Sequence, residues 1–278
     1  MLFRFYGWRI KVLRHKGYIC LVPLNLITMN DLLVYILMIA AGTAAGFINT
    51  LAGSGSLLTL PLLIFLGLPA NVANGTNRIG ILLQSIVAVG GFKQQKVFEW
   101  REGLWLTIPA TVGALLGAIM AVNINVVLMN RIIGALLVFM FFIILLKPEK
   151  WVKEQAGRVH AKPSLIRILV FTGIGFYGGF IQAGVGFFLL AGLVLGAGFD
   201  LLKANAIKVL IVLVFTVVAL AVFIINGQVN YTLGLILGAG NMLGAWIATR
   251  VAVKEGAVFV RWVLLVTVFV FAVKLLLF

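Results

Sequence analysis

The stretch TLAGSGSLLTLP, from Thr50 to Pro61, places two glycines and two serines inside an apolar run. Glycine and serine are poor residues for a helix interior, so we expect the helix to break near Gly53 and Gly55. Inside a bilayer, a broken helix is tolerated only where its backbone is buried in protein or lines a cavity. If this run lies in a membrane, the break therefore predicts a buried contact or a binding site.

The composition places the chain in a membrane. Of its 278 residues, 63% are hydrophobic and 10% are charged, and the mean hydropathy is +1.18. These values lie outside the range of soluble domains. The net charge of +15 comes from Lys and Arg in short connections between apolar runs, which is the positive-inside pattern of membrane proteins and not the clustered basic face of a nucleic-acid-binding protein. We expect a multi-pass protein of the cell membrane. Its expected partner is the lipid bilayer, and we expect no nucleic acid as a partner.

Eight apolar runs are long enough to cross a bilayer, because a helical span needs about 20 residues. They cover residues 31–51, 75–92, 103–123, 126–146, 166–184, 204–225, 230–249 and 256–277. Two further runs, 57–67 and 187–197, have 11 residues each, about 16 Å as helix, which is too short to cross. We therefore predict an all-α polytopic membrane protein with eight full spans and two short broken or re-entrant helices.

An internal duplication relates the two short runs. One constant shift along the chain places these residues on one another: Gly53 on Gly184, Gly55 on Gly186, Gly42 on Gly173, Gly67 on Gly198 and Asn74 on Asn205. The same shift across most of each half indicates a repeat. We expect membrane repeats at 29–148 and 163–278, joined by a cytoplasmic linker at 149–162 and preceded by a basic arm at 1–28. The Gly113-x-x-x-Gly117 pattern, by contrast, predicts plain helix packing.

The charged connections indicate that the two repeats are inverted. Three basic residues follow the 75–92 run, whereas the connection at 123–125 has none. In the second half the connection at 226–230 is uncharged, and Arg250 and Lys254 lie in the next one. Under the positive-inside rule the two halves then have opposite orientations in the membrane.

The arm does not fit this orientation, because it holds five basic residues and no acid before Met29. Two interpretations stay open. Either an extra interfacial or partial segment precedes Met29, or the true start of the protein is Met29 itself.

Polar residues at the breaks and after the short runs are the candidate substrate-binding residues. They are Gly53, Ser54, Gly55, Ser56, Gln182, Gly184 and Gly186 at the breaks, and Asn74, Thr76, Asn77, Arg78, Asn205 and Lys208 after the short runs. A charged residue inside a membrane is costly, so Arg78 and Lys208 are functional candidates, with snorkelling to the interface as the alternative. The asparagines are also candidate helix caps. A half-helix starting near Ser56 would direct N–H groups and a positive dipole end at an anion.

The distribution of acids and histidines argues against other chemistries. The chain has seven Asp and Glu and two His, none of them at the centre of a long apolar run. We therefore expect a small anionic substrate, with no metal, no cofactor and no catalytic residue. An anion channel remains an alternative. A remote alternative is an intramembrane serine protease, suggested by Ala52-Gly53-Ser54-Gly55, but no apolar run supplies a histidine base.

Two segments resemble the TauE/SafE family of membrane transporters, also called the sulfite exporter family. They are GFINTLAGSGSLLTLPLLIFLGLPANVANGTNR and GFYGGFIQAGVGFFLLAGLVLGAGFDLLKANAIK. The family pattern is a glycine-rich break, an apolar run ending in Gly-Leu-Pro and an Ala-x-Gly-Thr element. The first copy matches in order and spacing, whereas the second has Ala206-Ile207 where Gly-Thr is common. The resemblance covers nearly all of 31–278 and implies an inner-membrane permease or exporter for sulfite, organosulfonates or related small anions.

Overall fold

A computed structural model describes residues 2–5, 8–15, 18–23, 29–97, 100–146 and 164–277 of the chain. Side chains are described for residues 32–97, 104–136, 139 and 164–255. The chain forms two compact units, Met1–Met38 and Ile39–Phe278. The expected linker at 149–162 lies outside the described residues.

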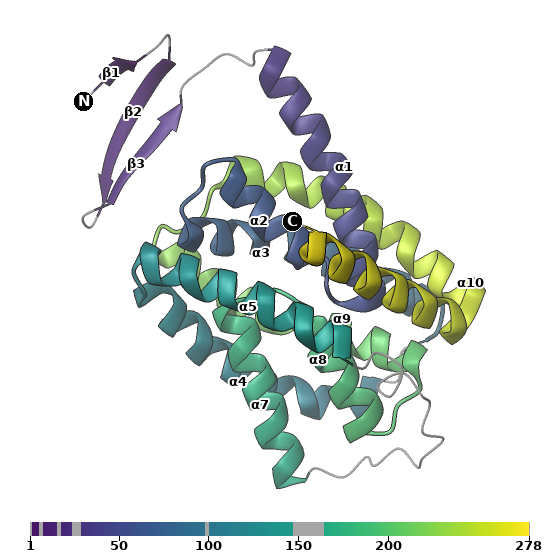
Figure 1. Ribbon diagram of the computed structural model, residues 1–278. Coiled ribbons are helices and arrows are strands. Elements are labelled where there is room, and N and C mark those ends of the chain that lie inside the picture. The colour runs from purple at the N-terminus through teal and green to yellow at the C-terminus, as the bar shows by residue number, and fades with distance from the viewer. Residues whose placement is uncertain are drawn as a thin grey trace. The chain divides into compact units, whose positions relative to one another are not determined.

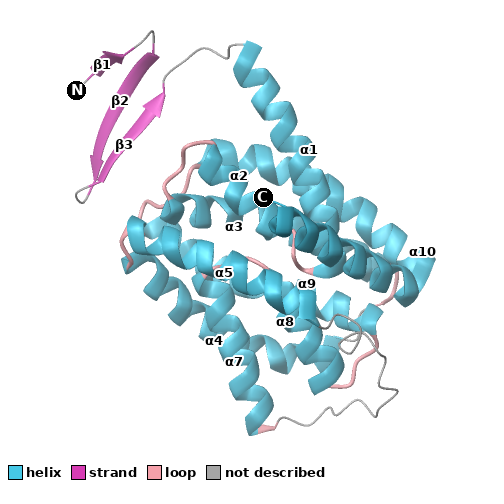
Figure 2. Cartoon of the chain, in the orientation of Figure 1, coloured by secondary structure: helices cyan, strands magenta, loops and turns pink. Residues whose placement is uncertain are grey.

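The basic arm contains a small antiparallel sheet with strand order β1-β2-β3 (Figure 2). Its strands are β1 (Leu2–Phe5), β2 (Trp8–His15) and β3 (Tyr18–Pro23). Apolar and basic residues alternate in WRIKV, the first five residues of β2, and such a period of two is typical of a strand. The all-α prediction therefore needs a correction for the arm, although every described element from Met29 onward is a helix.

Helices make up the rest of the described chain (Figure 1). They are α1 (Met29–Ala52), α2 (Ser56–Phe65), α3 (Ala70–Gln94), α4 (Trp100–Asn123), α5 (Val126–Leu146), α7 (Leu165–Phe180), α8 (Val185–Ala191), the π-helical turn η1 (Gly192–Gly196), α9 (Leu201–Ile225) and α10 (Tyr231–Leu277). Four described segments are long and apolar enough to cross a membrane: Leu32–Ala52, Leu104–Asn123, Leu201–Ile225 and Tyr231–Glu255. These helices agree with a multi-pass membrane protein.

One predicted connection is absent. We predict two spans at 230–249 and 256–277, but α10 runs through both as a single helix of 47 residues. The intervening sequence RVAVKE, residues 250–255, has no glycine, proline or asparagine. Nothing in it therefore forces the helix to end.

The local backbone recurs at the same constant shift as the sequence. Helices α3 and α9 both have 25 residues, and the shift that places Gly53 on Gly184 also places the bounds of α3, 70–94, on those of α9, 201–225. Gly53 and Gly184 have φ of +75° and +73°, and Gly67 and Gly198 have φ of +89° and +79°. Glycine is favoured at such left-handed positions because a side chain would strain them. The relative orientation of the two halves stays a prediction.

Small residues allow α4 and α7 to pack backbone to backbone. A Cβ added to Gly113 would collide with the carbonyl oxygen of Thr172, and one added to Gly117 with that of Phe176. The prediction that these two glycines serve packing is confirmed. Helices α3 and α9 also pack against each other, and they carry the two long basic side chains of the core, Arg78 and Lys208.

Candidate functional site

The two helix breaks meet in the interior of the Ile39–Phe278 unit. Cα of Gly53 lies so close to Gly186 that a Cβ on either residue would collide with the backbone of the other. Ser56 joins the same segments, since its hydroxyl donates to the carbonyl oxygen of Gln182 at 3.0 Å and accepts from the Gly184 N–H at 3.4 Å. The breaks therefore form one structural unit.

Arg78 of α3 is completely buried and holds the end of α7 at the second break. Its guanidinium donates to the carbonyl oxygens of Gly179 at 2.6 Å and Gly178 at 3.2 Å. Weaker contacts reach Oε1 of Gln182 at 3.5 Å and Oδ1 of Asn74 at 3.4 Å. A cation bonded to the last carbonyls of a helix caps that helix and offsets its dipole. Arg78 is thus a C-terminal cap of α7.

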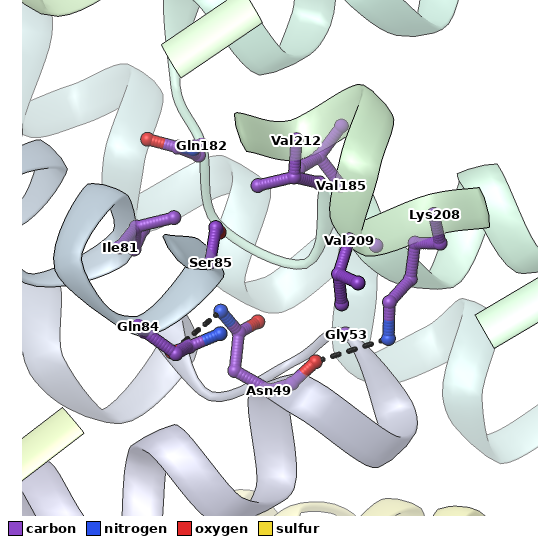
Figure 3. A pocket seen from close by; sticks show the side chains of 11 residues that line it. Asn49, Gly53, Ile81, Gln84, Ser85, Gln182, Val185, Lys208, Val209 and Val212 are labelled. Carbon is purple, nitrogen blue, oxygen red and sulfur yellow. Dashed lines mark hydrogen bonds between the residues drawn. The ribbon is translucent and has the colours of Figure 1, made fainter. Parts of the chain in front are cut away.

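Lys208 of α9 does the same for α1 at the first break. It is 1% exposed, and its Nζ donates to the carbonyl oxygens of Thr50 at 2.8 Å and Asn49 at 3.1 Å; Figure 3 shows the bond to Asn49. Each half of the chain therefore supplies the cation that caps the broken helix of the other half. Snorkelling, the alternative considered for both residues, does not apply, because neither side chain reaches the surface.

These buried cations have no acidic partner among the described side chains. Asp200 caps α9 and pairs with Lys203 at 3.8 Å, and Glu255 is exposed. A helix C-terminus carries about half a negative charge. Two full cations against two such ends leave about one positive charge at the paired breaks, which favours an anion.

A small cavity lies at the meeting point of the breaks, with a volume of about 10 Å³. Its polar lining residues are Asn49, Gln84, Ser85, Gln182 and Lys208, and its other lining residues are Gly53, Ile81, Val185, Gly186, Val209 and Val212 (Figure 3). The hydroxyl of Ser85 is buried without a hydrogen-bond partner. The volume suits about one water molecule. An anion of several atoms therefore fits only if the surrounding helices move apart.

The predicted site residues separate into three groups. Gly53, Gln182, Gly186 and Lys208 line the cavity. Ser56, Gly184, Asn74 and Arg78 hold the breaks together, Asn74 by donating to the carbonyl oxygen of Phe180 at 2.8 Å. The remaining residues, Ser54, Gly55, Thr76, Asn77 and Asn205, are buried but do not line the cavity.

Asn77 and Thr76, two residues of this third group, form hydrogen bonds within the protein. Asn77 accepts a hydrogen bond from the hydroxyl of Thr59 at 2.6 Å. Thr76 accepts one from the backbone N–H of Asn230, just before α10, at 2.9 Å. Ser54 and Asn205, in contrast, have buried side-chain polar atoms without a partner.

The N–H groups at the start of α2 are not all available to a ligand. Leu57 N–H donates to the carbonyl oxygen of Ser54 and Leu58 N–H to that of Gly55, both at 3.0 Å. The prediction of free N–H groups facing an anion is wrong for these two. Lys208 and the neutral polar side chains of the cavity are the better donors.

Three cavity residues were missed by the sequence interpretation, namely Asn49, Gln84 and Ser85. A signal for them exists, because each is a polar residue within an apolar run. All three lie outside the breaks and the segments directly after the short runs, to which the predicted candidates belong. Asn49 and Gln84 are joined by a hydrogen bond of 3.2 Å across the cavity (Figure 3).

Comparisons with known proteins identify the relatives of the chain. The family Sulfite exporter TauE/SafE matches residues 38–275. "Probable membrane transporter protein ORF9" of Sinorhizobium sp is 31% identical over 250 residues, covering 89% of this chain and 95% of that protein. "Probable membrane transporter protein YfcA" of Escherichia coli K12 is 29% identical, covering 91% and 93%, and a "Probable membrane transporter protein" of Haemophilus influenzae is 26% identical, covering 86% and 93%. No solved structure matches.

Proposed function

Since the chain belongs to the sulfite exporter TauE/SafE family of membrane transporters, we propose that it is a secondary transporter of a small anion such as sulfite or an organosulfonate. It works by alternating access around the cavity where the two breaks meet. It is a multi-pass protein of the bacterial inner membrane, and it needs neither a metal nor a cofactor. Family membership also favours transport over enzymatic activity.

The proposed architecture has two inverted repeats, each with one short re-entrant segment. The spans predicted at 230–249 and 256–277 are not counted separately in it, because α10 is one continuous helix through both. Helix α2 has 10 residues, and α8 with η1 covers 12, which correspond to about 15 and 18 Å of helix. Both are near half of the ~30 Å hydrocarbon core. The recurrence of the backbone at a constant shift and the alternating charge of the connections support this arrangement.

The observation that carries the proposal is the position of Lys208. Its ammonium group lies at the cavity, between the two breaks, without a carboxylate partner among the described side chains. An ammonium group has three N–H donors, and two of them are used by Asn49 and Thr50. The third is available to an anion in the cavity, whose lining also includes the unpartnered hydroxyl of Ser85.

The size of the cavity supports a carrier. A cavity of about 10 Å³ is too small for an anion of several atoms, so the anion needs a conformational change to enter. Saturation of the flux with substrate separates this carrier from the alternative of an anion channel. The protease alternative loses support, because no histidine lies in the described part of the Ile39–Phe278 unit that holds Ser54.

The test is sulfite counterflow in proteoliposomes with Lys208→Gln. Removing a charge-assisted hydrogen bond is worth about 1.5–3 kcal/mol, so we expect sulfite exchange to fall by about 10- to 100-fold. Lys203→Gln is the matched control, because Lys203 lies on the same helix, is 40% exposed and pairs with Asp200 at 3.8 Å. Full exchange activity in the folded Lys208→Gln variant contradicts the proposal.

A further inference from the structure

The hydrogen bonds of Lys208 use two of the three N–H groups of its ammonium group. Its Nζ donates to two carbonyl oxygens, those of Asn49 and Thr50. A neutral lysine amine has two N–H groups, and the ammonium has three. Both carbonyl bonds therefore survive deprotonation. The proton that can leave is the third one, which is not used by the end of α1.

Lys208 is the cavity's basic lining residue, and its Nζ bonds to the carbonyl oxygen of Asn49, another lining residue, so the third proton is the one left for a ligand there. Its loss would remove the positive charge and the donor available to an anion, while the cap on α1 stays in place. The binding of the anion and of this proton are consequently coupled. By linkage, each raises the affinity for the other to the same extent.

Other titratable groups do not share this position among the described side chains. The described side chains of α1 from Ile39 onward, and those of α2, α4, α8 and η1, include no titratable group. The hydroxyl of Tyr177 on α7 donates to the carbonyl oxygen of Ala183. The remaining ones are Arg78, Lys93 and Lys96 in and after α3, Arg131 on α5, Arg167 on α7, Asp200 and Lys203 at the start of α9, and Tyr231, Arg250, Lys254 and Glu255 on α10. None of these groups lines the cavity or hydrogen-bonds to Lys208.

Arg78, the other capping cation, differs from Lys208 in its contacts and in its chemistry. Arg78 caps the other broken helix through two carbonyl oxygens and also contacts the side chains of Gln182 and Asn74, and it does not line the cavity. An arginine remains protonated in proteins, whereas a buried lysine readily loses its proton. The chain thus has a permanent charge at one cap and a titratable one at the cap that faces the cavity.

We propose that Lys208 couples transport to protons: it binds the anion as an ammonium ion, and one proton crosses the membrane with each anion. On the release side the third proton passes from Nζ to water, and the neutral amine no longer holds the anion. On the other side Nζ takes a proton from water and binds the next anion. This inference rests on the proposed function, because it assigns the coupling ion to the same site.

The test uses methanesulfonate, an anion that stays fully ionised at working pH and so carries no proton of its own. Wild type in proteoliposomes is assayed for methanesulfonate counterflow at equal pH and for net uptake driven by an acidic exterior. With one proton per anion, a gradient of one pH unit supports about a tenfold accumulation. Lys208→Arg keeps the positive charge but cannot release the proton, so we expect counterflow at an altered rate and no accumulation. Lys203→Arg is the control that keeps both activities.

The outcomes separate the two proposals. Counterflow without pH-driven accumulation in wild type overturns proton coupling and leaves anion transport standing. Equal accumulation by Lys208→Arg and wild type also overturns it. The absence of counterflow with both methanesulfonate and sulfite refutes the transport proposal itself. If only sulfite exchanges, coupling is measured as the difference in pH-driven sulfite accumulation between wild type and Lys208→Arg, because the protonation of sulfite itself contributes equally to both, and uptake by protein-free liposomes is subtracted.

A measurement on wild type alone keeps the inference testable if Lys208→Arg does not fold. A pH indicator in a weakly buffered solution of the detergent-solubilised protein reports the protons that the protein takes up as methanesulfonate binds. We expect proton uptake upon binding, largest at a pH where free Lys208 is mostly neutral. Binding without proton uptake at every pH from 6 to 10 contradicts the inference.

Discussion

Replacing Gly186 by alanine tests the contact between the two breaks. A Cβ on Gly186 would collide with Cα of Gly53 and would lie 2.9 Å from its carbonyl oxygen. Nonbonded carbon atoms pack at about 3.5–4.0 Å, so the two backbones must separate by about 1 Å. Both are buried, and neither contact is with the flexible end of a side chain that can swing away.

The expected cost is that of overpacking a tight core, about 1–3 kcal/mol. At roughly 2–4 °C per kcal/mol for a chain of this size, the thermal midpoint in detergent should fall by about 2–12 °C. Sulfite exchange should slow as well, because the separation reaches the cavity. Gly173→Ala is the control, since a Cβ there meets no atom within 4 Å. If Gly186→Ala matches Gly173→Ala in midpoint and exchange, the breaks are not in contact as described.

Four further substitutions test separate contacts. Arg78→Gln should lower the thermal midpoint, because Gly178 and Gly179 lose their partner and each unpaired carbonyl costs about 1–3 kcal/mol; a midpoint like that of wild type argues against the capping role. Ser56→Ala should destabilise by about 1–2 kcal/mol through two lost bonds, whereas Ser54→Ala should not, since its hydroxyl has no partner; equal midpoints for the two variants contradict this. Ser85→Ala should leave the midpoint unchanged or raise it, because it removes an unpartnered buried hydroxyl. It should also weaken sulfite binding severalfold, as measured by a binding titration. Unaltered binding would mean that Ser85 does not contact the anion.

Local features of the fold follow from local sequence. The apolar runs predict helices, and the glycine pairs predict breaks, because hydrophobic periodicity and glycine content act over a few residues. The repeat that places Gly53 on Gly184 similarly predicts that both adopt the same conformation, and they do, with φ of +75° and +73°. The sheet of the arm was missed although its signal, the alternation in WRIKV, is equally local.

The partners of the buried polar groups were decided by tertiary structure. The sequence marks Arg78 and Lys208 as costly charges in a membrane, and it cannot say what each one meets. Lys208 bonds to a carbonyl oxygen 158 positions away, and Arg78 to one 101 positions away. Such contacts depend on how α3 and α9 cross the ends of α7 and α1, which no local pattern records. The stretch at Thr50–Pro61 by itself determines that the helix breaks, and only the packing of the two halves places that break against Gly186 and beneath Lys208.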